Sequence, residues 1–254
     1  MKTAVISGGN GGLGRALAAQ LEGRGWHTVL MDIDVSGLVA SPSRTPVAVD
    51  LTDAALLEKA AAEVIASRPS IDLVIYNAGV SQIGLFEKTV AQSHRQVFEI
   101  NYFAAVAMAR AFLRPIRESH GIHLAISSVA GFAPLHGRTG YAASKHALQG
   151  FFTSLRSEEA RHGVSCLIAA PSFVATNTGN VQTAHDGLVR PGSAQDGMDY
   201  MSPTAAAREI LRGLERRRDF IPVGRVARLA SLLMRISPGI YQRVMRRGVG
   251  VFES

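Results

Sequence analysis

Tyr141 and Lys145 stand four residues apart in a segment that reads Tyr-Ala-Ala-Ser-Lys and has helical periodicity. Residues at this spacing share one face of a helix, so we expect the phenol and the ammonium to lie side by side. A free phenol has a pKa of about 10 and is a weak base at neutral pH. A nearby ammonium favours the phenolate and lowers that pKa. The pair can therefore act as a general acid/base, with Tyr141 giving or taking a proton.

Ser128 directly follows the apolar run 122–127, which predicts a buried strand. Its hydroxyl would lie at the carboxyl end of that strand, where it could donate a hydrogen bond to an oxygen on which charge develops. Ser127 is the neighbouring alternative. Asn101 lies within a long predicted helix, an unfavourable place for asparagine. Taken alone it would be a surface or capping residue.

The segment from Ser7 to Gly14 reads Ser-Gly-Gly-Asn-Gly-Gly-Leu-Gly, follows a predicted strand and opens a predicted helix. Glycines there allow positive φ angles and a close approach of the backbone to a pyrophosphate, and the helix N-terminus supplies free N–H groups. The context of a strand before and a helix after favours a dinucleotide site over a plain turn.

Asp32 ends the second predicted strand. A carboxylate at this place can bind the adenosine ribose hydroxyls and would repel a 2′-phosphate. The next residue is Ile33, so no adjacent arginine is available for that phosphate. The sequence therefore favours NAD, with NADP as the alternative. Asp34 could share the role, and Arg15 is either a phosphate partner or a solvated helix residue.

These residues need elements that bring them together. Apolar runs predict strands at 3–7, 27–31, 46–49, 71–76, 122–127, 165–169 and 220–223, and helical periodicity predicts helices at 12–24, 53–67, 90–119, 141–162 and 202–217. Thr52 or Asp53 would cap the second helix. This alternation predicts an α/β fold, a single-domain Rossmann-type doubly wound parallel sheet of about seven strands with helices on both faces, over residues 1–254. Ligands of such sheets bind at the carboxyl ends of the strands.

With these motifs in this order, the chain resembles the short-chain dehydrogenase/reductase family over nearly its whole length. Asn101, Ser128, Tyr141 and Lys145 match the family's catalytic tetrad, with the usual separation of 13 residues between Ser128 and Tyr141. The resemblance implies that Asn101 holds a water connecting Lys145 to solvent and that Lys145 binds the nicotinamide ribose. An oxidised nicotinamide would further favour the Tyr141 phenolate.

The resemblance also implies a set of cofactor-binding residues. Tyr76 and Ser172 depart from the pattern, since an asparagine and a glycine are common at these places. The set comprises Ser7, Gly8, Asn10, Gly12, Leu13, Gly14, Asp32, Asp50, Leu51, Asn77, Ala78, Gly79, Tyr141, Lys145, Pro171, Val174 and Thr176.

The implied function is an NAD(P)-dependent oxidoreductase that interconverts a secondary alcohol and a ketone. One alternative is an NADPH-dependent ketone or 3-oxoacyl reductase. The other is an NAD-sensing regulatory protein, and the intact Tyr141/Lys145 pair argues against this second alternative. Family members commonly pair two helices between subunits, here 90–119 and 141–162, so a homodimer or homotetramer is expected. Small and apolar residues on these helices fit that pairing: Ala104, Ala105, Ala107, Ala109, Ala111, Phe151, Phe152 and Leu155.

Composition limits the partners. The formal charge of +7 lies entirely within 208–254, which holds 11 arginines and four acids, so no nucleic-acid partner is expected. No His/Cys/Asp cluster has metal-ligand spacing, so no metal is expected. The N-terminus does not resemble a signal peptide and no apolar run approaches the roughly 18–20 residues of a membrane span. Cys166 is the only cysteine and predicts a buried thiol. These absences favour a cytoplasmic location.

Two segments in the C-terminal part of the chain carry further predictions. Residues 177–203 predict a substrate loop or lid, whose apolar members Leu188, Met198, Tyr200 and Met201 suggest a largely apolar small-molecule substrate. Residues 223–254 predict a basic amphipathic extension interrupted at Pro238-Gly239. Its first helix would place Val226, Leu229, Ala230 and Leu233 on one face and Arg225, Arg228 and Arg235 on the other. The extension either packs on the pocket or a neighbouring subunit, or lies on an anionic membrane.

Overall fold

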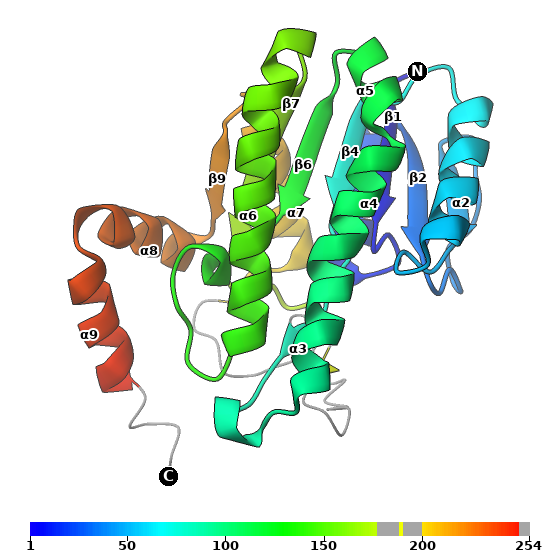
Figure 1. Cartoon of the computed structure of the whole chain (residues 1–254). Coiled ribbons are helices and arrows are strands. Elements are labelled where there is room, and N and C mark those ends of the chain that lie inside the picture. The colour runs from blue at the N-terminus through cyan, green and yellow to red at the C-terminus, as the bar shows by residue number, and fades with distance from the viewer. Residues whose placement is uncertain (177–187, 190–199, 249–254) are drawn as a thin grey trace.

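A seven-stranded parallel sheet forms the centre of the protein (Figure 1), in a computed structural model that describes residues 1–176, 188–189 and 200–248. The strand order is β3-β2-β1-β4-β6-β7-β9, so the direction of winding reverses between β1 and β4. The strands are β1 Thr3–Ser7, β2 His27–Asp32, β3 Arg44–Ala48, β4 Leu73–Tyr76, β6 Ile122–Ile126, β7 Ser165–Pro171 and β9 Phe220–Val223. The predicted Rossmann-type architecture is confirmed.

Helices cover both faces of the sheet, which explains why its central strands are buried and mostly apolar. Helices α2 (Ala54–Ser67), α4 (Ala104–Ala111) and α6 (Thr139–Glu159) pack on one face. Helices α1 (Gly12–Glu22) and α7 (Pro203–Glu215) pack on the other, and α7 lies behind the sheet in Figure 1. The carboxyl ends of β1, β4 and β6 therefore meet at one edge, between the two helical layers.

The predicted helix over 90–119 is three helices, α3 (Ala91–Phe98), α4 and α5 (Leu113–Glu118), with a π-helical turn at Glu99–Phe103. Pro115 has no N–H to donate to the carbonyl of Ala111, so an unbroken α-helix cannot run through this point. The π-helical turn contains Asn101, and such single turns often occur at functional sites. The turn buries Asn101 almost completely, with 1% of the residue exposed.

Helix α2 begins after Asp53, whose carboxylate accepts hydrogen bonds from the backbone N–H groups of Ala55 and Leu56. Of the two predicted caps, the structure therefore selects Asp53. A short antiparallel pair, β5 (Ser81–Gln82) with β8 (Leu188–Val189), was not predicted, because two-residue strands carry no periodic pattern. Most of the predicted lid over 177–203 lies outside the described residues.

The apolar residues expected at a subunit interface mainly face the sheet of their own chain. Ala104, Ala105, Ala109, Phe152 and Leu155 are buried in the core, and the remaining three (Ala107, Ala111 and Phe151) are half-buried against it. The homo-oligomer stays a prediction. No helix in the described part of the chain is both long and apolar enough to cross a membrane.

The C-terminal extension forms two helices, α8 (Arg225–Ile236) and α9 (Pro238–Gly248), with the break predicted at Pro238. The predicted faces of α8 are partly wrong. Ala230 is buried, but Leu229 is 68% exposed, because the buried face is centred on Ala227 and passes through Ala230 and Ser231.

Candidate active site

The glycine-rich turn after β1 contacts the end of β4 so closely that a side chain would not fit between them. Gly8 has a φ of +61°, and a Cβ on it would lie 2.8 Å from the Cα of Ala78. A Cβ on Gly14 would lie 2.2 Å from the carbonyl oxygen of Gly8. The turn therefore presents bare backbone next to the first turn of α1, the arrangement that accommodates a pyrophosphate.

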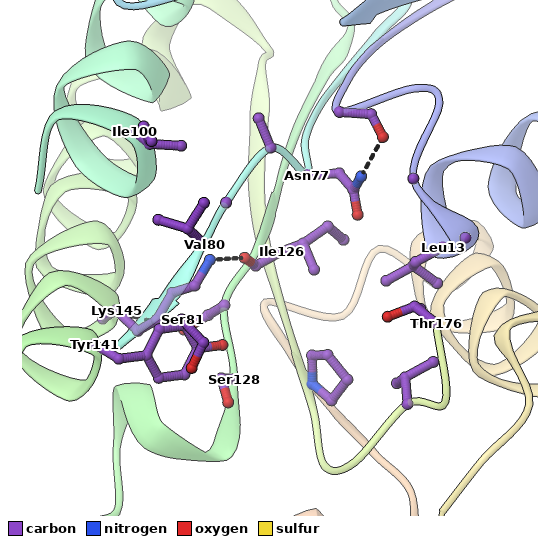
Figure 2. Close-up of a pocket in the computed structure, with 18 of the residues that line it drawn as sticks. Leu13, Asn77, Val80, Ser81, Ile100, Ile126, Ser128, Tyr141, Lys145 and Thr176 are labelled. Carbon is purple, nitrogen blue, oxygen red and sulfur yellow. Dashed lines mark hydrogen bonds between the residues drawn. The ribbon is translucent and has the colours of Figure 1, made fainter. Parts of the chain in front are cut away.

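Two predicted cofactor residues hold this contact together. The Ser7 hydroxyl accepts hydrogen bonds from the backbone N–H groups of Asn77 (3.0 Å) and Ala78 (3.1 Å). The Asn77 side chain in turn donates from Nδ2 to the carbonyl oxygen of Gly8 at 2.9 Å, as Figure 2 shows. Ser7 thus acts from behind the pocket wall and does not line it.

A cavity of about 460 Å³ opens along this edge of the sheet. All predicted catalytic and cofactor-binding residues line it except Ser7, Gly14 and Asn101. Figure 2 shows Ser128, Tyr141 and Lys145 together on one side of the pocket, and Leu13, Asn77 and Thr176 on the other. The residues predicted to bind a dinucleotide and those predicted to transfer a proton therefore share one cavity.

One end of the cavity, where the adenosine is predicted to bind, carries three carboxylates. Asp32 accepts a hydrogen bond from the backbone N–H of Asn10 at 2.9 Å, and Asp50 accepts one from the backbone N–H of Thr52 at 2.9 Å. Both line the cavity, and so does Asp34. Arg15 does not. Its guanidinium donates to the backbone carbonyls of Asn10 (3.0 Å) and Gly37 (3.3 Å), so it ties the loop after β2 to the glycine-rich turn.

Lys145 is buried, with 4% of the residue exposed, and its ammonium donates to the carbonyl oxygen of Ile126 at 3.0 Å (Figure 2). Burial lowers its pKa to about 8, because a low-dielectric environment disfavours the charged form. An ammonium has three N–H donors, and the one protein acceptor that Lys145 contacts within the described chain uses one of them. The remaining donors suit the hydroxyls of a ribose.

Tyr141 lies beside this ammonium, with the Lys145 nitrogen 5.9 Å from the centre of its ring. Burial raises the pKa of Tyr141 above its usual value, while a hydrogen bond with Ser128 and the charge of Arg138 act in the opposite direction. The sequence predicted a lowered pKa. In the protein without a nicotinamide, desolvation of the phenol outweighs the groups that favour the phenolate. The lowered pKa expected with the oxidised nicotinamide bound stays a prediction.

Asn101 holds the backbone on which this pair depends. Its side chain accepts from the N–H of Val80 at 2.8 Å and donates to the Val80 carbonyl at 2.9 Å. It also donates to the Ser144 hydroxyl at 3.0 Å, which itself donates to the Tyr141 carbonyl at 2.8 Å. The structure therefore places Asn101 behind the pocket, between the end of β4 and helix α6. Its predicted role in holding a water stays a prediction.

The two adjacent serines have different surroundings. Ser127 accepts a hydrogen bond from Gln149 Nε2 at 2.9 Å and packs under the 3₁₀ turn Val129–Gly131. Ser128 lines the cavity with Tyr141, and its hydroxyl accepts a hydrogen bond from the backbone N–H of Ala130 at 3.2 Å. Tyr76, which departs from the family pattern, points away from the cavity and bonds His123 Nδ1 at 2.6 Å inside the core.

Sequence reasoning missed several residues of the cavity wall. Arg138 is buried, with 7% of the residue exposed, and lines the cavity three residues before Tyr141. The only feature of the sequence that points to Arg138 is its position three residues before Tyr141. The apolar lining residues Val80, Ile83, Ile100 and Phe173 come from three separate segments and share no pattern. Among the residues that the structure describes, no group of three or more His, Cys, Asp or Glu side chains could hold a metal ion.

Comparison with known proteins agrees with this geometry. The sequence profile of the family described as "short chain dehydrogenase" matches residues 2–187. "Dehydrogenase/reductase SDR family member 7B" of Bos taurus is 32% identical, over 95% of this chain and 79% of that protein. "Putative oxidoreductase SadH" of Mycobacterium tuberculosis is 30% identical, over 99% of this chain and 96% of that protein.

Solved structures share the fold. A short chain dehydrogenase from Burkholderia cenocepacia J2315, in complex with NADP, superposes with a TM-score of 0.84 at 22% identity, over 96% of each chain. A short chain dehydrogenase/reductase from Burkholderia phymatum, in complex with NAD, gives a TM-score of 0.75 at 23% identity, over 87% of this chain and 88% of that one. On the family profile and these relatives, the chain belongs to the short-chain dehydrogenase family of NAD(P)-dependent oxidoreductases.

Proposed function

We propose that this protein interconverts a secondary alcohol and a ketone, with NAD as its cofactor. The observation that carries the proposal is the convergence of Ser128, Tyr141 and Lys145 on one wall of the cavity that the glycine-rich turn also lines (Figure 2). A hydroxyl donor, an ionisable phenol and a buried cation next to a dinucleotide cradle are the groups that such a reaction requires.

The residues around the cavity fit a dinucleotide. The bare turn at Gly8 and Gly12 and the N-terminus of α1 would hold the pyrophosphate, and Asp32 and Asp50 would bind the adenosine. Lys145 would bind the nicotinamide ribose. When bound, the nicotinamide supplies the group that accepts or donates the hydride.

The chain's own residues would handle the substrate oxygen and its proton. The Ser128 hydroxyl would donate a hydrogen bond to that oxygen and hold it next to the Tyr141 hydroxyl. During alcohol oxidation Tyr141 would take the hydroxyl proton, and during ketone reduction it would return it. The Lys145 ammonium would stabilise the phenolate, since it lies on the same side of the cavity as the Tyr141 ring.

The substrate side of the cavity supports a largely apolar substrate. Ile83, Leu135, Phe173 and Tyr200 contribute to its lining, and Phe173 and Tyr200 pack with ring centres 5.9 Å apart. The names of the two relatives, a dehydrogenase/reductase and a putative oxidoreductase, are consistent with redox chemistry on this site but define no substrate. A panel of alcohols and ketones, followed by the absorbance of the reduced nicotinamide, tests the reaction class.

The first prediction concerns Tyr141. Replacing it with phenylalanine removes only the ionisable hydroxyl, so we expect turnover to fall by roughly 10²- to 10⁴-fold, the usual range for a general acid/base. Cofactor binding should change little. Tyr102→Phe is the matched control, because Tyr102 is a half-buried tyrosine outside the cavity lining. Near-native turnover by Tyr141→Phe would refute the proton-transfer role.

The second prediction concerns Arg138, whose positive charge lowers the pKa of Tyr141. Arg138→Gln removes that charge, so the pKa of Tyr141 should rise and the rising limb of the pH profile for alcohol oxidation should move to higher pH. Arg138→Lys keeps the charge and should keep the profile. A profile that is identical in all three proteins would show that Arg138 does not act on Tyr141.

The third prediction concerns the cofactor. With Asp32 beside the ribose and Ile33 after it, kcat/KM should favour NAD over NADP by at least about tenfold, which corresponds to about 1.4 kcal/mol. The double variant Asp32→Ala/Ile33→Arg should reverse the preference, since it removes a repulsive charge and adds a cation. A native preference for NADP would contradict the assignment and favour the reductase alternative.

A further inference from the structure

We propose that the outward face of helix α8 binds the surface of anionic lipid membranes. Four large aliphatic side chains lie exposed between residues 229 and 240: Leu229 at 68%, Leu232 at 57%, Ile236 at 72% and Ile240 at 48%. Single exposed aliphatic residues are common on soluble proteins, but a contiguous group marks an interaction site. Burying such side chains in an apolar phase is favourable in proportion to the area removed from water.

Helical geometry places the first three of these residues on one side. Leu229, Leu232 and Ile236 follow each other at spacings of three and four residues, so they form one stripe. The opposite side of α8 is already used. Ala227 and Ala230 are buried in a small cluster with Val129 and Ala133, and this contact fixes the helix to the protein. The exposed stripe therefore does not contribute to the cluster that holds α8 in place.

The charge of the segment identifies the kind of partner. Residues 223–254 contain six arginines and a single acid, Glu253. On α8, Arg225, Arg228 and Arg235 are exposed beside the aliphatic stripe. Arg228 forms an ion pair with Glu209 at 2.8 Å, whereas no ion pair to Arg225 or Arg235 is found within the described ranges. Cations beside an aliphatic stripe match a partner with a negative surface and an apolar interior, as an anionic bilayer has.

Two other partners fit less well. In a symmetric contact between two copies the same surface meets itself, so the arginines of each copy would face those of the other without acids to match them. A nucleic acid would neutralise the arginines through its phosphates but would leave the aliphatic stripe in water. Of these three partners, only the anionic lipid surface matches both the arginines and the aliphatic stripe.

The position of α8 connects this face to the active site. In Figure 1, α8 lies near β9 at one edge of the sheet and α9 continues from α8, on the opposite side of the molecule from β2 and α2. The inner side of α8 packs on Val129 and Ala133, which follow Ser128 in the chain, and Tyr241 of α9 donates from its hydroxyl to the carbonyl of Pro134 at 3.2 Å. A membrane-bound α8 would hold the Ser128 side of the cavity close to the lipid surface.

The experiment is co-sedimentation of the full-length protein with vesicles of phosphatidylcholine alone or mixed with phosphatidylglycerol. At about 0.01 M salt, where charges interact over about 30 Å, the protein should bind only the anionic vesicles, and at about 1 M salt, where the range is about 3 Å, it should be released. Leu229→Ser/Leu232→Ser/Ile236→Ser should weaken binding at least about tenfold by removing the aliphatic stripe. Arg225→Gln/Arg235→Gln should weaken it by a similar factor.

Leu56→Ser is the matched control, since Leu56 is a 50% exposed leucine on α2, and it should bind vesicles as the native protein does. All substituted residues are exposed, and circular dichroism and thermal unfolding verify that the variants are folded. Absence of binding to anionic vesicles, equal binding to neutral ones, or binding that the α8 variants leave unchanged would overturn the proposal. If the serine variant instead dissociates an oligomer in light scattering, or the native protein binds duplex DNA and no vesicle, the face serves a second copy or a nucleic acid.

Discussion

A lysine ammonium group lies inside this protein, and much of the active-site architecture serves to keep it there. Lys145 is 4% exposed, so its ammonium is largely removed from water, and this desolvation lowers its pKa to about 8. At neutral pH the group is still mostly protonated. The Ile126 carbonyl at the end of β6 accepts one of its hydrogen bonds, and helix α6 carries it at a spacing of four residues from Tyr141. A buried cation with unused donors is unfavourable for stability and useful for binding a ribose and stabilising a phenolate.

The parallel sheet brings the glycine-rich turn and the segment after β4 to the same edge as Lys145, because its strands all end there. The close contact of Gly8 with Ala78 joins the ends of β1 and β4, and the hydrogen bonds of Ser7 and Asn77 fix it. Asn101 connects the segment after β4 to α6 through Val80 and Ser144, so its hydrogen bonds tie the wall near the glycine-rich turn to the helix that carries Tyr141 and Lys145. The π-helical turn is what brings the Asn101 side chain into that network.

Much of this could be predicted from the sequence, because strong local signals coincide with the site. Continuous apolar runs gave the seven strands, the glycine-rich segment gave the turn, and the spacing of Ser128, Tyr141 and Lys145 gave three neighbours in space. What could not be predicted depends on tertiary surroundings. The raised pKa of Tyr141 depends on how completely the phenol is buried, and the burial of Arg138 in the cavity wall depends on how the segment before α6 packs. Likewise, Leu229 was assigned to the wrong face, since periodicity does not show which side of α8 meets the protein.

We propose that Tyr141 is poised for proton transfer by its surroundings and by the bound cofactor. Ultraviolet difference titration measures this directly, because subtracting the spectrum of Tyr141→Phe from that of the native protein isolates one phenolate. Without NAD, Tyr141 should ionise above the usual tyrosine range, as its burial requires. With saturating NAD, its pKa should fall, because the positive charge of the oxidised nicotinamide stabilises the phenolate. An ionisation of Tyr141 that occurs at the same pH with and without NAD would contradict the account.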